Sequence, residues 1–209
     1  MSTEKQNILK RIRKALERPV PLPFPKAEQQ QKIYQRSEED LAVIFAEEFT
    51  RLQGKFGFFS DLDLLAKELI EMIRKFEWKE VYCAEQGLRI LLKKNGFHDF
   101  SNKSLSFADV AITTCEALVA RTGTMVMSAA LPEGRTASVY APIHVCIAEV
   151  SQLVFDAEHA LQFLKEKYGT HLPSQISFAT GPSRTADIEK TLVVGVHGPK
   201  EVYCLLADK

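Results

Sequence analysis

Short apolar segments alternate with amphipathic segments along most of the chain, and this alternation narrows the folds that it can adopt. Three of the apolar segments carry few polar residues on either face: ADVAITTC (108–115), PIHVCIAEV (142–150) and EVYCLLAD (201–208). Strands that are apolar on both faces are typical of a parallel sheet covered on both sides. The segments with helical periodicity that would supply the cover are 41–52, 62–76, 86–96 and 156–169. We therefore predict a three-layer α/β/α domain with a mainly parallel sheet.

Other segments predict further elements of this domain, which we expect to span residues 36–208. Three more apolar segments predict strands: EVYCAE (80–85), TGTMVMSAA (122–130) and SQISFATG (174–181). EALVAR (116–121) predicts one or two helical turns, and SRTADIEKTLVVG (183–195) predicts a helix. The strands around Met125 and Ile143 are close in sequence, so part of the sheet can be antiparallel.

Residues 1–25 form a separate segment of different character. Ile8, Leu9, Ile12 and Leu16 recur at helical spacing within residues 3–17, with Lys and Arg on the other side. PVPLPFP (19–25) follows and predicts an extended, semi-rigid spacer. We expect this arm to dock on the parent domain or on a second subunit of a homo-oligomer. Binding to a membrane surface is the alternative.

Composition excludes several classes of protein. Lys plus Arg and Asp plus Glu number 27 each, so no global charge favours nucleic acid. The first residues lack the apolar core of a signal peptide, and no segment approaches the roughly 20 apolar residues of a membrane span. We therefore expect a cytoplasmic protein. Four widely spaced cysteines without a CxxC motif predict buried free thiols and no metal site: Cys83, Cys115, Cys146 and Cys204.

The stretch TGPSRTADIEKTLVVGVHGPKEVYCLLAD (180–208) carries the densest set of turn and polar residues. If a helix begins after Pro182, Ser183 or Thr185 can cap it, and Asp187 and Glu189 favour its positive end. Arg184 opposes that dipole. An anion held by the helix start, the two hydroxyl groups and the Arg184 guanidinium accounts for it.

Three other positions are candidates for the same site. His197 and Gly198 lie in a GVHGP turn, where the imidazole can bind a ligand or act as an acid or base near neutral pH. The hydroxyl groups of Thr122 and Thr124 flank Gly123 at the start of a predicted strand. Glu116, near a strand end, is either a partner of a helix dipole or a carboxylate of the site.

Arg135 and His144 complete the candidate ligand-binding residues. Arg135 follows Gly134 in a predicted loop, and His144 lies on a strand beside apolar neighbours, where a hydrogen-bonded core histidine is the common alternative. Neither GxGxxG nor GxxxxGK[ST] occurs, so the sequence identifies no cofactor.

Several of these stretches together resemble the LUD domain, a lactate-utilization family. ARTGTMVM (120–127), GRTASVYAPIHVCIAEV (134–150) and above all GPSRTADIEKTLVVGVHGPKEVYCLLAD (181–208) carry the resemblance, which covers about residues 36–208. It implies a fold similar to the sugar-phosphate isomerase and CoA-transferase group and a role in oxidising L-lactate to pyruvate beside iron–sulfur partner subunits. The chain departs from the family at Arg121, where the family usually has Glu. An arginine there adds positive charge, and Glu116 is five positions earlier.

The leading hypothesis is an accessory subunit of a cytosolic lactate-oxidising system that binds a small anionic ligand. Arg184, Arg135 and Arg121 would then supply charge-assisted hydrogen bonds. A free-standing isomerase- or CoA-transferase-like enzyme, with Glu116 as base or nucleophile and His197 as acid or base, is one alternative. A protein that only assembles an iron–sulfur partner is the other.

Overall fold

The computed structural model describes residues 3–17, 39–185 and 193–208, which are divided between two units. The first unit ends at Ser37, and its described part is helix α1 (Thr3–Leu16). This helix covers almost all of the predicted 3–17 segment, whereas the predicted spacer at 19–25 lies outside the described residues. The second unit begins at Glu38 and contains both sheets. Among the described residues, no helix is long and apolar enough to cross a membrane.

A five-stranded sheet in which all neighbouring strands are parallel forms the centre of the second unit. Its strands, in spatial order, are β1 (Lys55–Phe59), β11 (Glu201–Ala207), β6 (Ile143–Glu149), β3 (Val110–Thr113) and β2 (Val81–Tyr82). The segments predicted at 80–85, 108–115, 142–150 and 201–208 therefore all contribute strands. The predicted parallel sheet is confirmed. The edge strand β1, with sequence KFGFF, is an addition that the sequence pattern did not predict.

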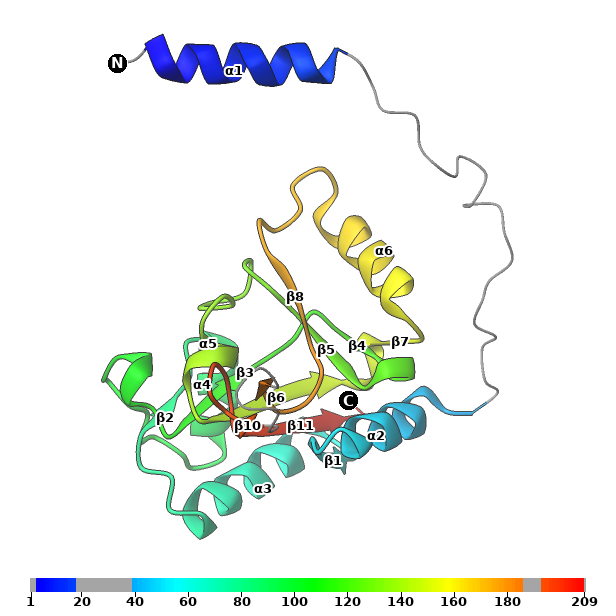
Figure 1. Cartoon of the computed structure of the whole chain (residues 1–209). Coiled ribbons are helices and arrows are strands. Elements are labelled where there is room, and N and C mark those ends of the chain that lie inside the picture. Colours follow the sequence, from blue (N-terminus) through cyan, green and yellow to red (C-terminus); the bar gives the residue numbers. More distant parts are fainter. Residues whose placement is uncertain (1–2, 18–38, 186–192, 209) are drawn as a thin grey trace. The chain divides into compact units, whose positions relative to one another are not determined.

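One face of this sheet is covered by two helices, α3 (Leu62–Lys75) and α4 (Gln86–Lys94). Asp61 caps α3, because its carboxylate accepts a hydrogen bond of 2.8 Å from the backbone N–H of Leu64. Leu65, Leu69 and Leu92 from the helices are fully buried in the cluster that contains Ile112, Val145 and Leu205 from the strands. Figure 1 shows α3 beside β11 and β1.

The other face is covered by helix α2 (Leu41–Arg51) and by a second sheet. The second sheet has the order β7 (Leu153–Val154), β4 (Ala117–Val119), β5 (Thr124–Ser128) and β8 (Ile176–Ala179). Its β4–β5 and β5–β8 pairs are antiparallel. The strands around Met125 and Ile143 thus belong to two different sheets. Phe45 and Phe49 of α2 share a buried cluster with residues of both sheets.

The segment 116–121 is a strand and a 3-10 turn, not the predicted helical turns. Leu118 of β4 packs in the cluster between the two sheets, whereas Ala117 and Val119 pack in the cluster under helix α6 (Ala157–Tyr168). This alternation is that of a strand between two apolar layers. A six-residue segment with four adjacent apolar residues cannot reveal such a period. Figure 1 shows α6 beside β4, β5, β7 and β8.

The predicted helix at 183–195 is also not observed in its described part. Arg184–Thr185 form strand β9, which pairs antiparallel with β10 (Val193–Val194). Asp187 and Glu189 lie outside the described residues. Two short elements matter for the site described below: helix α5 (Ala137–Tyr140), before β6, and the 3-10 turn η3 (Ala120–Thr122), before β5.

The end of α2 packs so closely on η3 that only glycine fits at the point of contact. Gly123 has φ +56°, and a Cβ atom there would lie 2.4 Å from the backbone N of Phe49. A second glycine, Gly181, has φ +73° and would place a Cβ atom 2.8 Å from the carbonyl oxygen of Leu52. The last turn of α2 is therefore held by backbone contacts to two segments that follow different strands.

Replacing Gly123 with Ala should destabilise the fold strongly. The left-handed conformation costs an alanine about 1–2 kcal/mol, and the contact with the Phe49 backbone requires movement of α2. We expect a total loss of about 3 kcal/mol in the free energy of unfolding, measured by urea denaturation. Gly87→Ala is the matched control, because Gly87 lies in α4 with nothing within 4 Å of its Cβ position. It should be neutral or stabilising by up to about 1 kcal/mol. Equal effects of the two substitutions would contradict this account of the contact.

Candidate functional site

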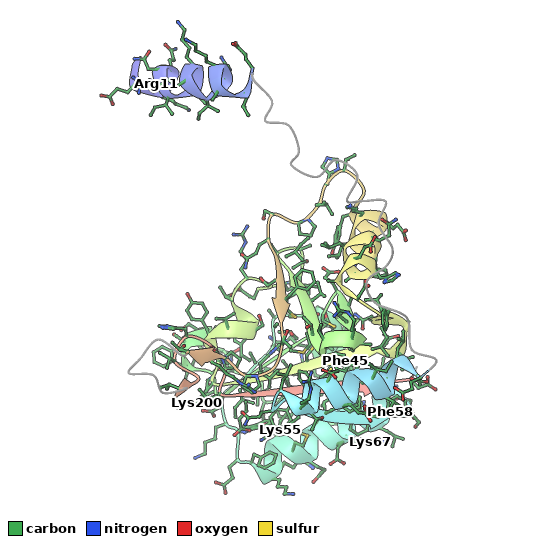
Figure 2. All side chains as sticks on the ribbon, turned by 45° about the vertical axis from the view of Figure 1, so that its right-hand side comes forward. Arg11, Phe45, Lys55, Phe58, Lys67 and Lys200 are labelled. Atoms are coloured by element: carbon green, nitrogen blue, oxygen red, sulfur yellow. The ribbon has the colours of Figure 1, made fainter. Side chains whose placement is uncertain are left out.

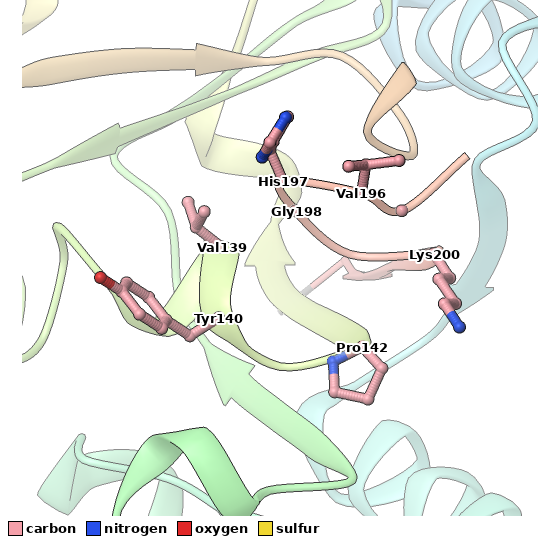
Figure 3. A pocket seen from close by; sticks show the side chains of 8 residues that line it. Val139, Tyr140, Pro142, Val196, His197, Gly198 and Lys200 are labelled. Atoms are coloured by element: carbon pink, nitrogen blue, oxygen red, sulfur yellow. The ribbon is translucent and has the colours of Figure 1, made fainter. Parts of the chain in front are cut away.

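A surface pocket of about 410 Å³ lies before the amino ends of β6 and β11. Its lining comes from α5, from the residue before β6 and from the turn that precedes β11: Val139, Tyr140, Pro142, Gly195, Val196, His197, Gly198 and Lys200. Figure 3 shows the α5 residues across the pocket from the segment that carries Val196 and His197. Figure 2 shows Lys200 and Phe58 at opposite ends of the central sheet. The pocket is therefore at the amino edge, whereas ligands of such sheets usually bind at the carboxyl edge.

The turn that builds the pocket is fixed by backbone hydrogen bonds. Ser183 donates from its N–H to Pro199 O at 3.0 Å and accepts from Gly195 N–H at 2.9 Å. Gly195 has φ +79°, and a Cβ atom there would meet the Lys200 stem at 2.1 Å. A Cβ atom on Gly198 would lie 2.9 Å from Ser183 Cβ. The structure thus brings together Ser183, His197 and Gly198, three of the residues predicted for the site.

The described polar side chains that line the pocket can all donate hydrogen bonds. Lys200 contributes a cationic ammonium group, Tyr140 a hydroxyl group and His197 an imidazole, and none of the described lining residues is acidic. All three side chains are exposed. The apolar part of the lining comes from Val139, Pro142 and Val196. This combination suits a small organic anion with an apolar part.

Arg184 has a different role from the one expected. Its guanidinium donates hydrogen bonds to the carbonyl oxygen of Leu52 and, at 3.4 Å, to Oε1 of Gln53. Leu52 is the C-cap of α2, where the helix dipole favours a cation. The prediction of a helix over 183–195 placed the guanidinium near an unfavourable positive end. The structure places it at the negative end of another helix, so no anion is needed to explain it.

The predicted threonines form a hydroxyl chain beside this contact. Thr122 Oγ1 lies 2.7 Å from Thr124 Oγ1, which lies 2.8 Å from Thr180 Oγ1. Thr124 is buried. Thr185 pairs with Val193 in the β9–β10 ribbon, and Arg121 donates from its backbone N–H to Phe155 O at 3.0 Å. None of these residues lines the pocket of about 410 Å³.

Glu116 is buried and accepts hydrogen bonds from three side chains. Lys167 Nζ and the Tyr168 hydroxyl, both from the end of α6, donate at 2.7 Å, and the Ser128 hydroxyl at the end of β5 also donates. Burial raises the pKa of a carboxyl group, but these hydrogen bonds outweigh it, and the pKa of Glu116 is lowered. Its carboxylate ties α6 to the second sheet and does not line the pocket.

The last two predicted residues lie in separate surroundings. Arg135 is exposed and donates a 2.5 Å hydrogen bond to the Ser174 hydroxyl. His144 is buried on β6, with Nε2 at 2.8 Å from Thr113 Oγ1. Burial lowers the pKa of His144 to about 4, so this imidazole is neutral at pH 7. It is a hydrogen-bonded histidine of the core, beneath the amino edge of the sheet.

The four cysteines are free and buried. Burial raises the pKa of Cys83 to about 11, and the hydrogen bond with Cys146 together with burial raises that of Cys115. The thiols of Cys83 and Cys115 are therefore protonated at neutral pH. Among the described residues, no group of His, Cys, Asp and Glu side chains could hold a metal ion.

Sequence reasoning missed two polar side chains of the pocket, Lys200 and Tyr140, and the three hydrogen-bond donors to Glu116. Lys200 directly follows the GVHGP turn, so its place beside His197 was a signal in the sequence. Tyr140 reaches the pocket from α5, and nothing near it in the sequence points to His197. Lys167 and Tyr168 are 51 and 52 residues from Glu116 and gave no local signal.

These features define a mixed α/β domain with a parallel sheet and a polar pocket at its amino edge. A model of the LUD domain family matches residues 25–207, and the chain belongs to this family. A solved DUF162 family protein from Deinococcus radiodurans has a similar fold, with a TM-score of 0.60 at 16% identity over 83% of this chain and 99% of that one.

Curated relatives carry the name lactate utilization protein C. The one from Anoxybacillus flavithermus is 39% identical over 103 residues, which are 49% of this chain and 46% of that protein. The one from Shouchella clausii is 29% identical over 187 residues, which are 83% of this chain and 82% of that protein. The one from Bacillus subtilis is 37% identical over 110 residues, 51% and 46% of the two chains. For the first and third of these, the match spans about half the length of the relative.

Stability should depend on the ionisation of Glu116 at low pH. Because its pKa in the folded protein lies below the ordinary value of 4.5, the stabilisation is fully present above that value. It is lost as the pH falls through the folded pKa. Glu116→Gln should cost about 1–3 kcal/mol at pH 7. The difference from the parent protein should shrink as the pH falls below 4.5.

The measurement is urea denaturation of both proteins across this pH range. The matched control is Glu166→Gln, an exposed position on the same helix, which should change stability by less than about 0.5 kcal/mol. A Glu116→Gln difference that stays constant as the pH falls would refute the role assigned to the carboxylate.

Proposed function

We propose that this protein serves in lactate utilization and that it binds a small organic anion in the pocket around His197 and Lys200. Membership of the LUD domain family and the names of its relatives support the pathway. The composition of the pocket supports the ligand class, since its polar lining consists of an ammonium, a hydroxyl and an imidazole group. This absence of acidic side chains among the described lining residues is the observation that carries the proposal.

The ligand is a carboxylate or a phosphorylated compound. Lys200 would neutralise the anionic group, and the Tyr140 hydroxyl and an imidazole N–H of His197 would donate hydrogen bonds to it. The flexible stem of Lys200 is steadied by its packing on Gly195, where a Cβ atom would lie 2.1 Å from it. Val139 and Val196 would contact the apolar part of the ligand.

In this role the protein would be a cytoplasmic accessory subunit, with iron–sulfur subunits of a lactate-oxidising system as its partners. The family resemblance supports this assignment. The alternative of a free-standing enzyme requires Glu116 to act as a base or nucleophile. Its lowered pKa and its three hydrogen-bond donors favour a structural role. The ligand therefore binds without help from Glu116.

Lys200→Met should weaken binding of the anion while preserving the apolar stem. Loss of a charge-assisted hydrogen bond, worth about 1.5–3 kcal/mol, corresponds to at least about a tenfold higher Kd. Binding is measured by thermal shift and calorimetry with lactate, pyruvate, inorganic phosphate and coenzyme A as probes. His197→Gln should also raise the Kd for the anion.

The matched control is Lys165→Met, at an exposed lysine of α6, which should bind the same probe with unchanged Kd. Arg184→Gln should also retain binding, because Arg184 contacts the end of α2 instead of lining the pocket. If no probe stabilises the parent protein, or if Lys200→Met binds as tightly as the parent, the pocket is not the anion site.

A further inference from the structure

Helix α1 exposes a continuous aliphatic stripe. At about 100° of rotation per residue, its four large aliphatic side chains fall within an arc of about 100°. Their exposed fractions are 59% for Ile8, 40% for Leu9, 49% for Ile12 and 74% for Leu16. A helix of 14 residues has marginal stability in water by itself. A surface that covers the stripe would therefore stabilise the helix.

The rest of the helix surface is strongly basic. Residues 3–17 contain five basic and two acidic side chains, a net charge of +3, although the whole chain is neutral. At the same rotation per residue, Arg11 and Arg13 lie on opposite flanks of the stripe, and Lys10 and Lys14 lie behind it. All four of these side chains are exposed, as Figure 2 shows for Arg11. Lys5 lies within the angular range of the stripe, near its amino end, where its long aliphatic stem can extend the apolar surface.

From this arrangement we infer that α1 binds in the interface of an anionic lipid bilayer, with its aliphatic stripe toward the acyl chains. An amphipathic helix that lies in the plane of a bilayer has headgroups along both flanks. Arg11 and Arg13 point to both flanks, which matches a headgroup layer better than the single contact strip of a protein groove. The arginine stems lie against apolar surface while the guanidinium groups reach the phosphates.

Charge also decides against a second copy of α1 as the partner. Two such helices packed along their stripes would bring the flanking arginines of both copies together, and like charges at these positions destabilise the pair. The inference depends only on α1 and is independent of the anion pocket. Binding through one short helix should be reversible and sensitive to salt, because its electrostatic part falls off within a Debye length.

The test is co-sedimentation of the full-length protein with vesicles. The protein should bind to vesicles of phosphatidylcholine that contain roughly one-third phosphatidylglycerol. It should bind much less to vesicles of phosphatidylcholine alone. Binding should weaken when NaCl is raised from about 0.1 M to about 1 M, which shortens the Debye length about threefold. Arg11→Gln/Arg13→Gln should lower the partition coefficient at least about tenfold, since each cation near an anionic surface is worth about fivefold.

The apolar part is tested by Ile8→Gln/Ile12→Gln, which should abolish sedimentation with the anionic vesicles. Ile90→Gln is the matched control, because Ile90 is an isoleucine of α4 with a similar exposed fraction of 58%, and it should bind like the parent. Equal binding by Ile8→Gln/Ile12→Gln and the parent would overturn the inference. Failure of the parent to prefer anionic vesicles would also overturn it and leave an acidic protein as the candidate partner.

Two measurements without vesicles test whether a second copy or another part of the chain covers the stripe instead. If Ile8→Gln/Ile12→Gln converts an oligomer into a monomer in analytical ultracentrifugation, a second copy covers the stripe. If the same variant lowers the Tm of the protein, the stripe packs on another part of the chain. Either result would assign the stripe to protein and overturn the inference, whereas an unchanged oligomeric state and Tm are expected.

Discussion

The contact between the last turn of α2 and two glycines organises the amino edge of the central sheet. Gly123 meets the backbone of Phe49, and Gly181 meets the carbonyl group of Leu52. Arg184 then donates to the same carbonyl group. Because α2 continues into β1 after only three residues, the end of the helix is itself fixed to the sheet. One helix end thereby positions the segments that follow η3 and β8.

The two edges of the central sheet differ in how their polar groups are used. At the carboxyl end of β3 the chain turns directly into the second sheet, and its polar groups are used internally. Glu85 accepts hydrogen bonds of 2.6 Å from both the N–H and the hydroxyl group of Thr114, and Glu116 accepts three more from side chains. At the amino edge, by contrast, His197 and Lys200 are exposed beside a pocket. The proposed anion pocket therefore lies at the edge opposite to the one where ligands of parallel sheets usually bind.

The sequence predicted the elements whose apolar pattern extends over enough neighbouring residues to be recognised. Strands β3, β6 and β11 are apolar on both faces and were predicted, as were the four helices with clear periodicity. Strand β1 was missed because KFGFF is short and interrupted by Gly57. The helix predicted from Ser183 failed because Arg184 and Thr185 pair with residues eight or more positions away, and the pairing partner is invisible to a local pattern.

The same distinction between local and distant information applies to the site. Ser183, His197 and Gly198 were predicted from one stretch, and they do lie together. Tyr140 joins them from a different segment, and Lys167 reaches Glu116 from α6. Arg184 shows a further limit, because its charge was recognised correctly while its partner was not. A cation at the end of α2 and a cation in an anion site look the same in the sequence.

The distribution of charge constrains both proposals. Residues 1–37 contain nine basic and three acidic side chains, so in a neutral chain the second unit, residues 38–209, carries a net charge of −6. The second unit as a whole therefore repels anions, and an anion must be attracted by groups at contact distance, such as Lys200. The same net charge would repel an anionic bilayer. The Debye length of about 8 Å at physiological ionic strength limits that repulsion to short range. Binding of a bilayer through α1 therefore has to outweigh only the repulsion from acidic groups within that range.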